Sequence, residues 1–215
     1  SGFGISREDI QRMKAWKANA IRLAVKDTFW SDAKGAIYQK NVKRAVTWIL
    51  EAGMDVILDL HYVAGNPTDA HRTFWSQVSS DAFFRDGRII YELYNEPTDS
   101  AENLRPWMQG TVDAIRANGA QNLIIVSGRD YTYDISYYVG NPVTGGAIAY
   151  ATHPYDFKSD PGDQVAYLTP AASIPVIATE FGDANVEGFN IVPPTQCDGS
   201  IYSNYINKFE GAGMS

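Results

Sequence analysis

The sequence predicts an α/β fold with a parallel sheet, a TIM-type (β/α)8 barrel, and three observations support it. Short apolar runs alternate with longer amphipathic stretches along the chain of 215 residues, a pattern typical of strands covered by helices. The runs recur at intervals of about 25–35 residues, the length of one strand with its crossover helix. No glycine-rich phosphate turn occurs, which disfavours the open, nucleotide-binding alternative.

Six apolar runs are expected to form the strands. They cover residues 20–25, 56–61, 89–94, 122–126, 147–152 and 175–181. A closed barrel of this type has eight strands, so the predicted barrel is incomplete in this span and lacks the first and the eighth. Gly213, Met214 and Ser215 are compatible with the opening of one further strand. The two open edges would expose unpaired backbone groups, which favours association through them.

Helices are expected between the strands. Ser6 is the predicted N-cap of the first helix, and Asp9 completes a capping box with it. Two later stretches repeat apolar residues at the helical spacing and then meet a glycine, which is typical of a helix stop. Their apolar positions are Val42, Ala45, Val46 and Ile49 before Gly53, and Met108, Val112 and Ile115 before Gly119.

The composition is that of one globular domain over residues 1–215, and it excludes several functions. Apolar residues make up 45% and charged residues 20%, and no apolar run approaches the about 20 residues of a membrane helix. The net charge of −7 repels phosphate backbones, so nucleic acid is not an expected partner, and without a membrane helix a membrane is not expected either. The single cysteine, Cys197, excludes an internal disulfide. It is either a free thiol or the partner of a cysteine outside this span.

Ionisable side chains gather on one face of the expected strands, toward the C-terminal ends. Alternate side chains of a barrel strand face the interior and the helices, and enzymes on this scaffold carry their chemistry at the C-terminal ends. The parity that includes Arg22 is expected inside, and the opposite parity, which includes Ile177, outside. The expected interior residues are Ala20, Arg22, Ile57, Asp59, His61, Ile90, Glu92, Tyr94, Glu96, Ala149, Ala151, His153, Tyr155, Val176, Ala178 and Glu180.

Two glutamates of this set, Glu96 and Glu180, end separate strands. Two carboxylates across a barrel mouth can cleave a glycosidic bond, one as a protonated acid and the other ionised as a nucleophile or base. Each alone could equally be a solvated strand end or half of an ion pair. The two histidines, the arginine and the tyrosine at the same end favour the catalytic interpretation. No H-x-x-x-H spacing occurs, so no metal site is expected at the histidines.

Five segments at strand ends, in this order, carry a resemblance to a known family. They are Asn19-Ala20-Ile21-Arg22-Leu23, Asp59-Leu60-His61-Tyr62, Leu93-Tyr94-Asn95-Glu96-Pro97, His153-Pro154-Tyr155 and Ala178-Thr179-Glu180-Phe181-Gly182. With them, nearly the whole chain resembles glycoside hydrolase family 5, a family of retaining enzymes on a (β/α)8 barrel. The resemblance implies that Glu96 is the general acid and base and that Glu180 is the nucleophile. Retention requires carboxyl groups about 5–5.5 Å apart.

The resemblance also implies roles for the side chains around the two carboxylates. Asn95 is expected to bind the sugar 2-hydroxyl. Arg22 and Tyr155 are expected to hydrogen-bond the nucleophile and keep it ionised, which in turn holds the acid protonated. Arg22 can equally pair with interior carboxylates in a structural network. His61 and His153 are expected to contact sugar hydroxyls or to orient the carboxylates. Two further residues are expected to support the site without reacting: Asp59 and Glu92.

Aromatic rings are expected to stack on the apolar faces of sugars, and the chain carries 13 Tyr and 5 Trp. Trp30, after the first expected strand, is the first subsite candidate, and Tyr62 is the second. Tyr131 and Tyr133 stand where similar sequences often carry an aromatic residue. The four other tryptophans, Trp16, Trp48, Trp75 and Trp107, are expected to pack on helices. His71 is expected to be exposed.

The expected function is endo-acting, retaining hydrolysis of β-1,4-glucan polysaccharide or oligosaccharide by a secreted enzyme without cofactor or metal. A β-mannanase or mixed-linkage glucanase is the alternative within the same chemistry. A metal-dependent lyase of the enolase type is a second class, but Ser127-Gly128 places no acid at the end of its strand. A third class is a non-catalytic carbohydrate-binding fragment.

Overall fold

A sheet of six parallel strands forms the centre of the molecule, in the order β1-β2-β3-β4-β5-β6. The computed structural model describes residues 4–155, 162–182, 186–187, 190–191 and 200–214, so Cys197 lies outside the described residues. The strands are β1 (Ala20–Val25), β2 (Asp55–Leu60), β3 (Ile89–Glu92), β4 (Ile124–Ser127), β5 (Ile148–Thr152) and β6 (Val176–Ala178). All six predicted strands are confirmed, and consecutive strands pair as in a (β/α)8 barrel.

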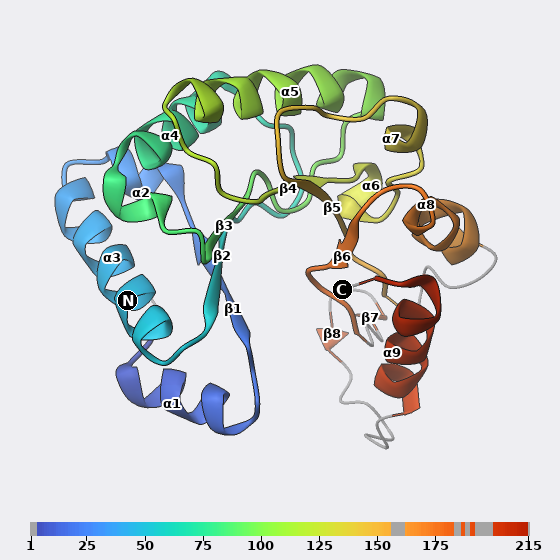
Figure 1. Cartoon of the computed structure of the whole chain (residues 1–215), viewed down its shortest axis with the longest axis horizontal. Helices are drawn as coiled ribbons and strands as arrows, with labels where there is room; N and C mark the ends of the chain where they lie inside the picture. Colours follow the sequence, from blue (N-terminus) through green and yellow to red (C-terminus); the bar gives the residue numbers. More distant parts are fainter. Residues whose placement is uncertain (1–3, 156–161, 183–185, 188–189, 192–199, 215) are drawn as a thin grey trace.

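The helices lie in an arc around the outside of this sheet (Figure 1). The helical elements are α1 (Arg7–Ala15), α2 (Asp27–Ser31), α3 (Gly35–Glu51), α4 (Asp69–Ser80), η1 (Ala82–Arg85), α5 (Ala101–Ala117), α6 (Arg129–Thr132), α7 (Tyr137–Gly140), η3 (Gln164–Leu168), α8 (Thr169–Ala171) and α9 (Ser200–Ala212). Two short strands, β7 (Val186–Glu187) and β8 (Asn190–Ile191), form a separate antiparallel pair. Within the described ranges, no helix combines the length and apolarity needed to cross a membrane.

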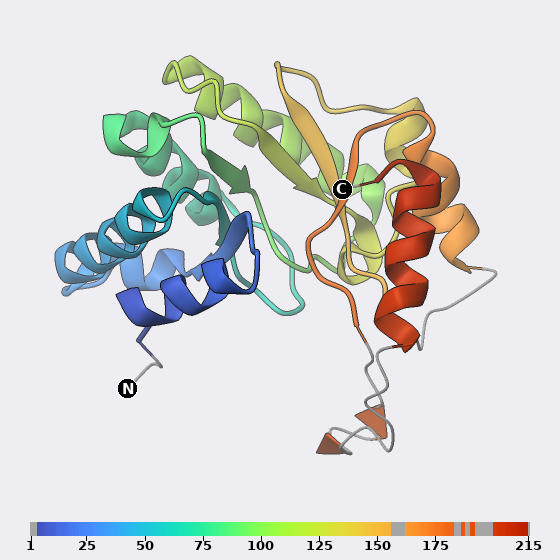
Figure 2. The same cartoon turned by 60° about the horizontal axis from the view of Figure 1, so that its bottom comes forward.

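The strands β1 and β6 are the two edges of the sheet, so the described part of the chain forms a partial barrel. The open side of this partial barrel lies between helices α1 and α9 (Figure 2). The prediction of a further strand at Gly213 and Met214 is wrong for these residues. Gly213 has φ 68° and the Met214 N–H donates to the Phe209 carbonyl (2.9 Å), so the two residues end helix α9.

The two faces of the sheet pack in separate clusters, as the strand parity predicts. On the face away from the helices, Ile57, Ile125 and Ala151 form a small cluster, with Ile90 and Ile177 against it. On the other face, apolar strand side chains such as Val56, Leu58 and Ile124 join the large core under the helices. The interior of the partial barrel is therefore lined by few apolar groups, which leaves room for ionisable side chains near the strand ends.

The predicted parity of the last strand is wrong by one residue. Ile177 pairs in register with Ala151 and packs in the interior cluster, while Val176 and Ala178 pack against the helices. The strand ends at Ala178, and the chain bends at the next two residues. A parity counted back from Glu180 therefore fails, because the alternation stops before that residue is reached.

The same cause displaces Tyr94. Strand β3 ends at Glu92, and two residues later the Tyr94 ring lies in the helix-side core. It stacks on Tyr62 (centroids 5.4 Å apart, 10° between planes) and meets Trp107 of α5 at 6.4 Å. The prediction that Tyr94 faces the interior is therefore wrong.

The predicted helix signals are confirmed. The Ser6 Oγ accepts from the Asp9 N–H, and an Asp9 carboxylate oxygen accepts from the Ser6 N–H, which completes the capping box. Gly53 and Gly119 follow α3 and α5 with φ 71° and 83°. The apolar positions predicted for the two helices are all buried: Val42, Ala45, Val46, Ile49, Met108, Val112 and Ile115.

Two predictions of exposure are wrong. Trp16, expected to pack, is 77% exposed because it caps the C-terminus of α1 beyond the buried face. His71, expected in solvent, is buried because it lies in the first turn of α4, where its Nδ1 accepts from the Thr68 N–H (2.9 Å). Its ring also packs against Tyr62.

Truncation of a buried α3 side chain is expected to destabilise the protein. Ile49→Ala removes a fully buried side chain and leaves a cavity under the sheet, so the free energy of unfolding is expected to fall by about 2–5 kcal/mol. Ile37→Ala, at an exposed position of the same helix, is the matched control, with an expected change within about 0.5 kcal/mol. Urea denaturation of the intact protein measures both. Equal losses would contradict the assigned core.

Candidate active site

Arg22, in the middle of β1, binds four side chains through its guanidinium group. Its Nε donates to Glu92 (2.5 Å) and its Nη1 to Glu180 (2.5 Å). Its Nη2 donates to Asn95 Oδ1 (2.6 Å) and lies 3.2 Å from Asp59 Oδ2. Burial by itself lowers the pKa of Arg22, but the three carboxylates outweigh burial and raise it. The two roles predicted for Arg22, binding the nucleophile and pairing interior carboxylates, therefore occur together.

Glu180 has a donor on each of its two oxygens. Arg22 donates to Oε1, and the Tyr155 hydroxyl donates to Oε2 (2.9 Å). Burial by itself raises the pKa of Glu180, but the charges of His153 and Arg22 and the two hydrogen bonds outweigh burial and lower it. This carboxylate is therefore held ionised and oriented, as a nucleophile requires.

Glu96 lies opposite this carboxylate, beside His153. The Nδ1 of His153 is 3.2 Å from Glu96 Oε1 and 3.8 Å from Glu180 Oε2. One oxygen of each glutamate and a ring nitrogen of His153 all lie within 4.8 Å of one another. The two predicted catalytic carboxyl groups thus share one pocket, although 84 positions separate them in the sequence.

A partly buried chain of hydrogen bonds continues behind His153. Its Nε2 lies 2.9 Å from the Thr179 hydroxyl, which donates to Glu92 Oε1 at 2.7 Å. Burial raises the pKa of Glu92, the charge of Asp59 adds to this, and Arg22 opposes both. The sequence pattern does not indicate Thr179, because its inward position depends on the bend after β6. The strand parity, in contrast, predicts that Glu92 faces the interior.

His61 lies at the rim of this network. Its Nδ1 is 2.7 Å from Asp59 Oδ2, and this hydrogen bond is the main reason why the pKa of His61 is raised. The imidazole is about one-third exposed, whereas Asp59 is fully buried. The structure therefore brings together seven predicted residues: Arg22, His61, Asn95, Glu96, His153, Tyr155 and Glu180.

The two aromatic subsite candidates do not offer open rings. Trp30 is 5% exposed and packs edge-on against Phe74 (5.2 Å), because α2 turns it into the helix-side core. Tyr62 stacks on Tyr94, and the Lys26 ammonium lies 3.6 Å from its ring centroid. Its hydroxyl donates to Asp27. Trp30 is therefore packed, and the prediction that it stacks on substrate is wrong for this structure, whereas Tyr62 is only partly buried and its role stays a prediction.

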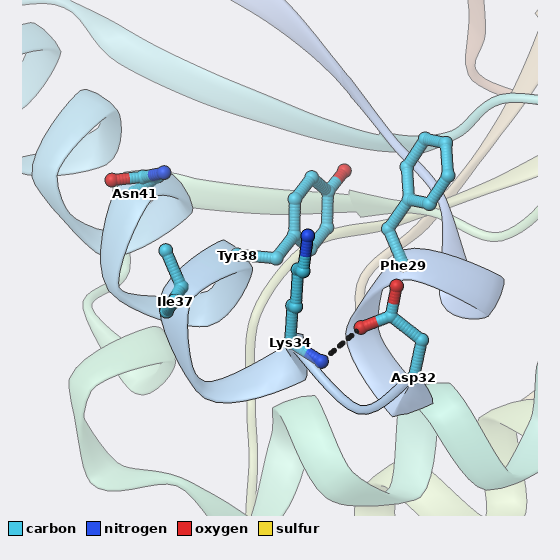
Figure 3. A pocket seen from close by; sticks show the side chains of 6 residues that line it. All are labelled: Phe29, Asp32, Lys34, Ile37, Tyr38 and Asn41. Carbon is cyan, nitrogen blue, oxygen red and sulfur yellow. Dashed lines mark hydrogen bonds between the residues drawn. The ribbon is translucent and has the colours of Figure 1, made fainter.

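The exposed aromatic ring of the α2 segment belongs to Phe29, whereas the sequence pattern pointed to Trp30. It is 55% exposed and lines a cavity of about 230 Å³ together with Tyr38 of α3 (Figure 3). The Lys34 N–H donates to the Asp32 carboxylate at the rim (2.6 Å). The polarity pattern could not distinguish Phe29 from Trp30, which are adjacent, because the direction of each ring depends on a helix of five residues.

A strained turn after β4 contacts the Glu96 segment. Asp130, Tyr131 and Thr132 all have positive φ (54°, 58° and 60°), which is costly for residues with a side chain. The Tyr131 N–H donates to the Pro97 carbonyl (3.0 Å), and the Thr132 carbonyl accepts from the His153 N–H (2.9 Å). The turn thus links the segment that carries Glu96 to the segment that carries His153.

The two tyrosines near this turn differ in their surroundings. Tyr131 is 44% exposed, beside the Glu96 segment, and its role as a sugar-stacking residue stays a prediction. Tyr133 is buried and donates to Asp163 (2.7 Å), so the corresponding expectation for Tyr133 is wrong.

The cluster of Glu96, His153 and Glu180 is also compact enough to consider a metal ion. Arg22 and Tyr155, however, already donate to both oxygens of Glu180, and positive charge is thereby supplied by the protein. The arrangement is compatible with proton transfer and nucleophilic attack. No cofactor is required for that chemistry.

Known proteins match this chain in sequence. The sequence profile described as Cellulase (glycosyl hydrolase family 5) matches residues 3–210. An endoglucanase of Clostridium saccharobutylicum is 26% identical over 183 residues, which are 80% of this chain and 40% of that protein. Endoglucanase Z of Dickeya dadantii is 26% identical over 213 residues, 94% of this chain and 49% of that protein. The chain thus spans less than half the length of these two curated relatives.

Solved structures match the fold. A β-glucanase from Saccharophagus degradans, solved in its native form and with cellotetraose, superposes with a TM-score of 0.83 at 24% identity. The match covers 98% of this chain and 72% of that one. The catalytic domain of endoglucanase Cel5A from Thermobifida fusca gives a TM-score of 0.77 at 20% identity, covering 98% and 72%. At these identities the likeness establishes the fold.

Removal of the central cation is expected to destabilise the protein strongly. Arg22→Met leaves buried carboxylates without a compensating charge, so the free energy of unfolding is expected to fall by about 3–5 kcal/mol. Arg12→Met breaks an exposed pair with Glu8 on α1 and is the matched control, with an expected loss below about 1 kcal/mol. Thermal and urea unfolding of the intact protein test both. Equal stability of the Arg22 variant and the parent would refute the role assigned to the guanidinium.

Proposed function

Because the chain belongs to glycosyl hydrolase family 5, we propose that it carries the catalytic site of an endo-acting β-1,4-glucanase that works by retaining double displacement. The observation that carries the proposal is the pair Glu96 and Glu180, whose nearest oxygens lie within 4.8 Å. Retaining glycosidases place their carboxyl groups about 5–5.5 Å apart, and inverting ones about 6.5–9.5 Å. The relatives named endoglucanases, and the cellotetraose complex of the Saccharophagus protein, support a β-glucan substrate.

In the first step, an ionised Glu180 oxygen attacks the anomeric carbon while Glu96 protonates the leaving glycosidic oxygen. The carbon–oxygen bond to the leaving sugar breaks, and a glycosyl ester forms on Glu180. Arg22 and Tyr155 stabilise the carboxylate before attack and when it leaves again. In the second step, Glu96 takes a proton from water, and the water oxygen displaces Glu180 with net retention.

In this proposal Asn95 holds the sugar during both steps. Its Oδ1 accepts from Arg22, and one hydrogen of its Nδ2 is donated to the Tyr62 carbonyl (3.2 Å). The second hydrogen of Nδ2 is the donor that we assign to the sugar 2-hydroxyl. A hydrogen bond to that hydroxyl strengthens as positive charge develops on the ring.

The proposal extends to the setting in which the enzyme works. A glucan polymer is too large to enter a cell, so we place the protein outside the cell. A mixed-linkage β-glucan is the second substrate candidate, because one structural relative is named a β-glucanase. Mannan is the third, because the same two carboxylates would cleave it. Within the described residues β1 and β6 each have an unpaired edge, and association at these edges is part of the proposal.

Removal of either carboxylate is expected to separate the two steps of the reaction. Glu180→Ala is expected to lower hydrolysis of carboxymethyl cellulose by at least about 1,000-fold, since no glycosyl ester can form. Glu96→Ala with an activated aryl glycoside and azide is expected to yield the β-glycosyl azide, because azide needs no general base. Glu102→Ala, on the exposed surface of α5, is the control with parental rates.

The assay compares carboxymethyl cellulose, barley glucan and mannan, and NMR follows the anomer that is released first. Retention is expected. Inversion, or parental rates in both glutamate variants, would falsify the assignment.

Loss of the Tyr155 hydroxyl is expected to move the acidic limb of the pH profile. The hydrogen bond from Tyr155 lowers the pKa of Glu180, so Tyr155→Phe raises that pKa. Glu180 must be ionised to attack, and activity is lost as pH falls through its pKa. The acidic limb of kcat/KM is therefore expected to shift to higher pH in the variant. Tyr137→Phe, in α7, is the control with an unchanged limb, and a shift to lower pH in Tyr155→Phe would contradict the assigned contact.

A further inference from the structure

The side chains behind Glu96 form a partly buried chain of hydrogen bonds that the double displacement does not itself require. His153 and Glu92 are fully buried, and Thr179 lies between them. The chain runs from Glu96 through His153 and Thr179 to Glu92, and it ends on Arg22 (2.5 Å). Arg22 lies in the middle of β1 and Glu92 at the end of β3, while Glu96, His153 and Thr179 lie in the segments that follow β3, β5 and β6.

The hydrogen-bond capacities of these groups fix the direction of the chain. Arg22 can only donate, so Glu92 Oε2 accepts at 2.5 Å, and the Thr179 hydroxyl donates to Glu92 Oε1 at 2.7 Å. The one hydrogen of Thr179 is thereby used. Thr179 can then interact with His153 only as an acceptor, so the histidine Nε2 must carry a hydrogen.

The opposite arrangement leaves a buried oxygen unpaired. If His153 carried its hydrogen only on Nδ1, Thr179 would have to donate to Nε2. Glu92 Oε1 would then lose its donor, and His153 Nε2, 4.0 Å away, could not replace it. An oxygen without a donor in the protein interior is unfavourable, which disfavours that tautomer.

We propose that Thr179 and Glu92 are positioning residues for general acid–base catalysis, because they hold the His153 proton on Nε2 and leave Nδ1 to share a proton with Glu96. This inference rests on the proposed function and assigns new roles within the same site. Nδ1 faces Glu96 Oε1 at 3.2 Å, and Glu180 Oε2 at 3.8 Å is the other charged group that it faces. One proton between Nδ1 and Glu96 therefore satisfies both atoms.

The proton balance follows from this arrangement. Glu96 gives the shared proton to the leaving oxygen in the first step, and a proton from water replaces it in the second. The hydrogens on Nε2 and Thr179 stay in place throughout, so the chain neither gains nor loses a proton over a turnover. Thr179 and Glu92 act on the reaction only through the orientation and protonation of His153.

The tautomer of His153 is the first test. This chain has three histidines, so ¹H–¹⁵N correlation spectra of the intact protein, with histidine variants for assignment, can identify the His153 signals. A protonated Nε2 is expected in the parent. In the Glu92→Gln variant, the glutamine carbonyl must face Arg22, which can only donate, and the glutamine NH₂ must face Thr179. The direction of the hydrogen bonds along the chain is thereby reversed. The expected spectrum of this variant shows the hydrogen on Nδ1 and an unprotonated Nε2.

The dependence on the leaving group is the second test. Thr179→Val removes the hydroxyl but keeps the shape, so kcat/KM for an aryl cellobioside with a poor leaving group is expected to fall by about 10- to 100-fold. With a dinitrophenyl leaving group, which departs without a proton, a change below about threefold is expected. Thr179→Ser keeps the hydroxyl and is expected to restore the poor substrate. Thr111→Val removes a buried hydroxyl in α5, outside the site, and is the matched control with no change in this dependence.

Two results would overturn the inference. One is a parent His153 with its hydrogen on Nδ1 alone. The other is a Thr179→Val variant whose loss is equal for both leaving groups, which indicates a structural effect. Failure of the proposed function is a different outcome, since the intact parent would then hydrolyse none of the glycans, while the tautomer measurement would still decide on the chain.

Discussion

The contact of one guanidinium group with three carboxylates is the constraint on which the interior of the sheet depends. Asp59 and Glu92 are fully buried on neighbouring strands, and Glu180 reaches the same point from the end of β6. Negative groups this close in a medium of low polarity would repel one another strongly. Arg22 lies between them and therefore allows β1, β2, β3 and the segment after β6 to converge.

The same contact makes the two glutamates of the pocket different. Glu180 receives donors from Arg22 and Tyr155, while Glu96 meets an imidazole nitrogen. In the proposed function, two identical side chains thus take opposite tasks because their partners differ, the pattern by which enzymes assign an acid and a nucleophile. The structural role of Arg22 and its proposed functional role cannot be separated, because its bond to Glu180, the proposed nucleophile, belongs to the network that holds the strands.

The sequence predicted the parts of the fold and the site that follow from local periodicity. Strand alternation places Arg22 and Glu92 inside, and the strand ends place Glu96 in the pocket. Prediction failed where alternation ends, because the bend after β6 turns Thr179 inward and no local pattern signals that bend. Ring directions were also inaccessible: Trp30 is packed and its neighbour is exposed, since packing of the short α2 determines which ring faces the core.

The three consecutive left-handed residues after β4 have a consequence for how this protein can be altered. Their backbone energy is unfavourable, and it is tolerated because Pro97 and His153 hold the turn from both sides. Glycine at Asp130 or Tyr131 would relax the backbone and free the loop to move. A substitution chosen to raise thermal stability at this turn would therefore loosen a segment that contacts the Pro97 and His153 backbones, so stability and the proposed activity are in conflict here.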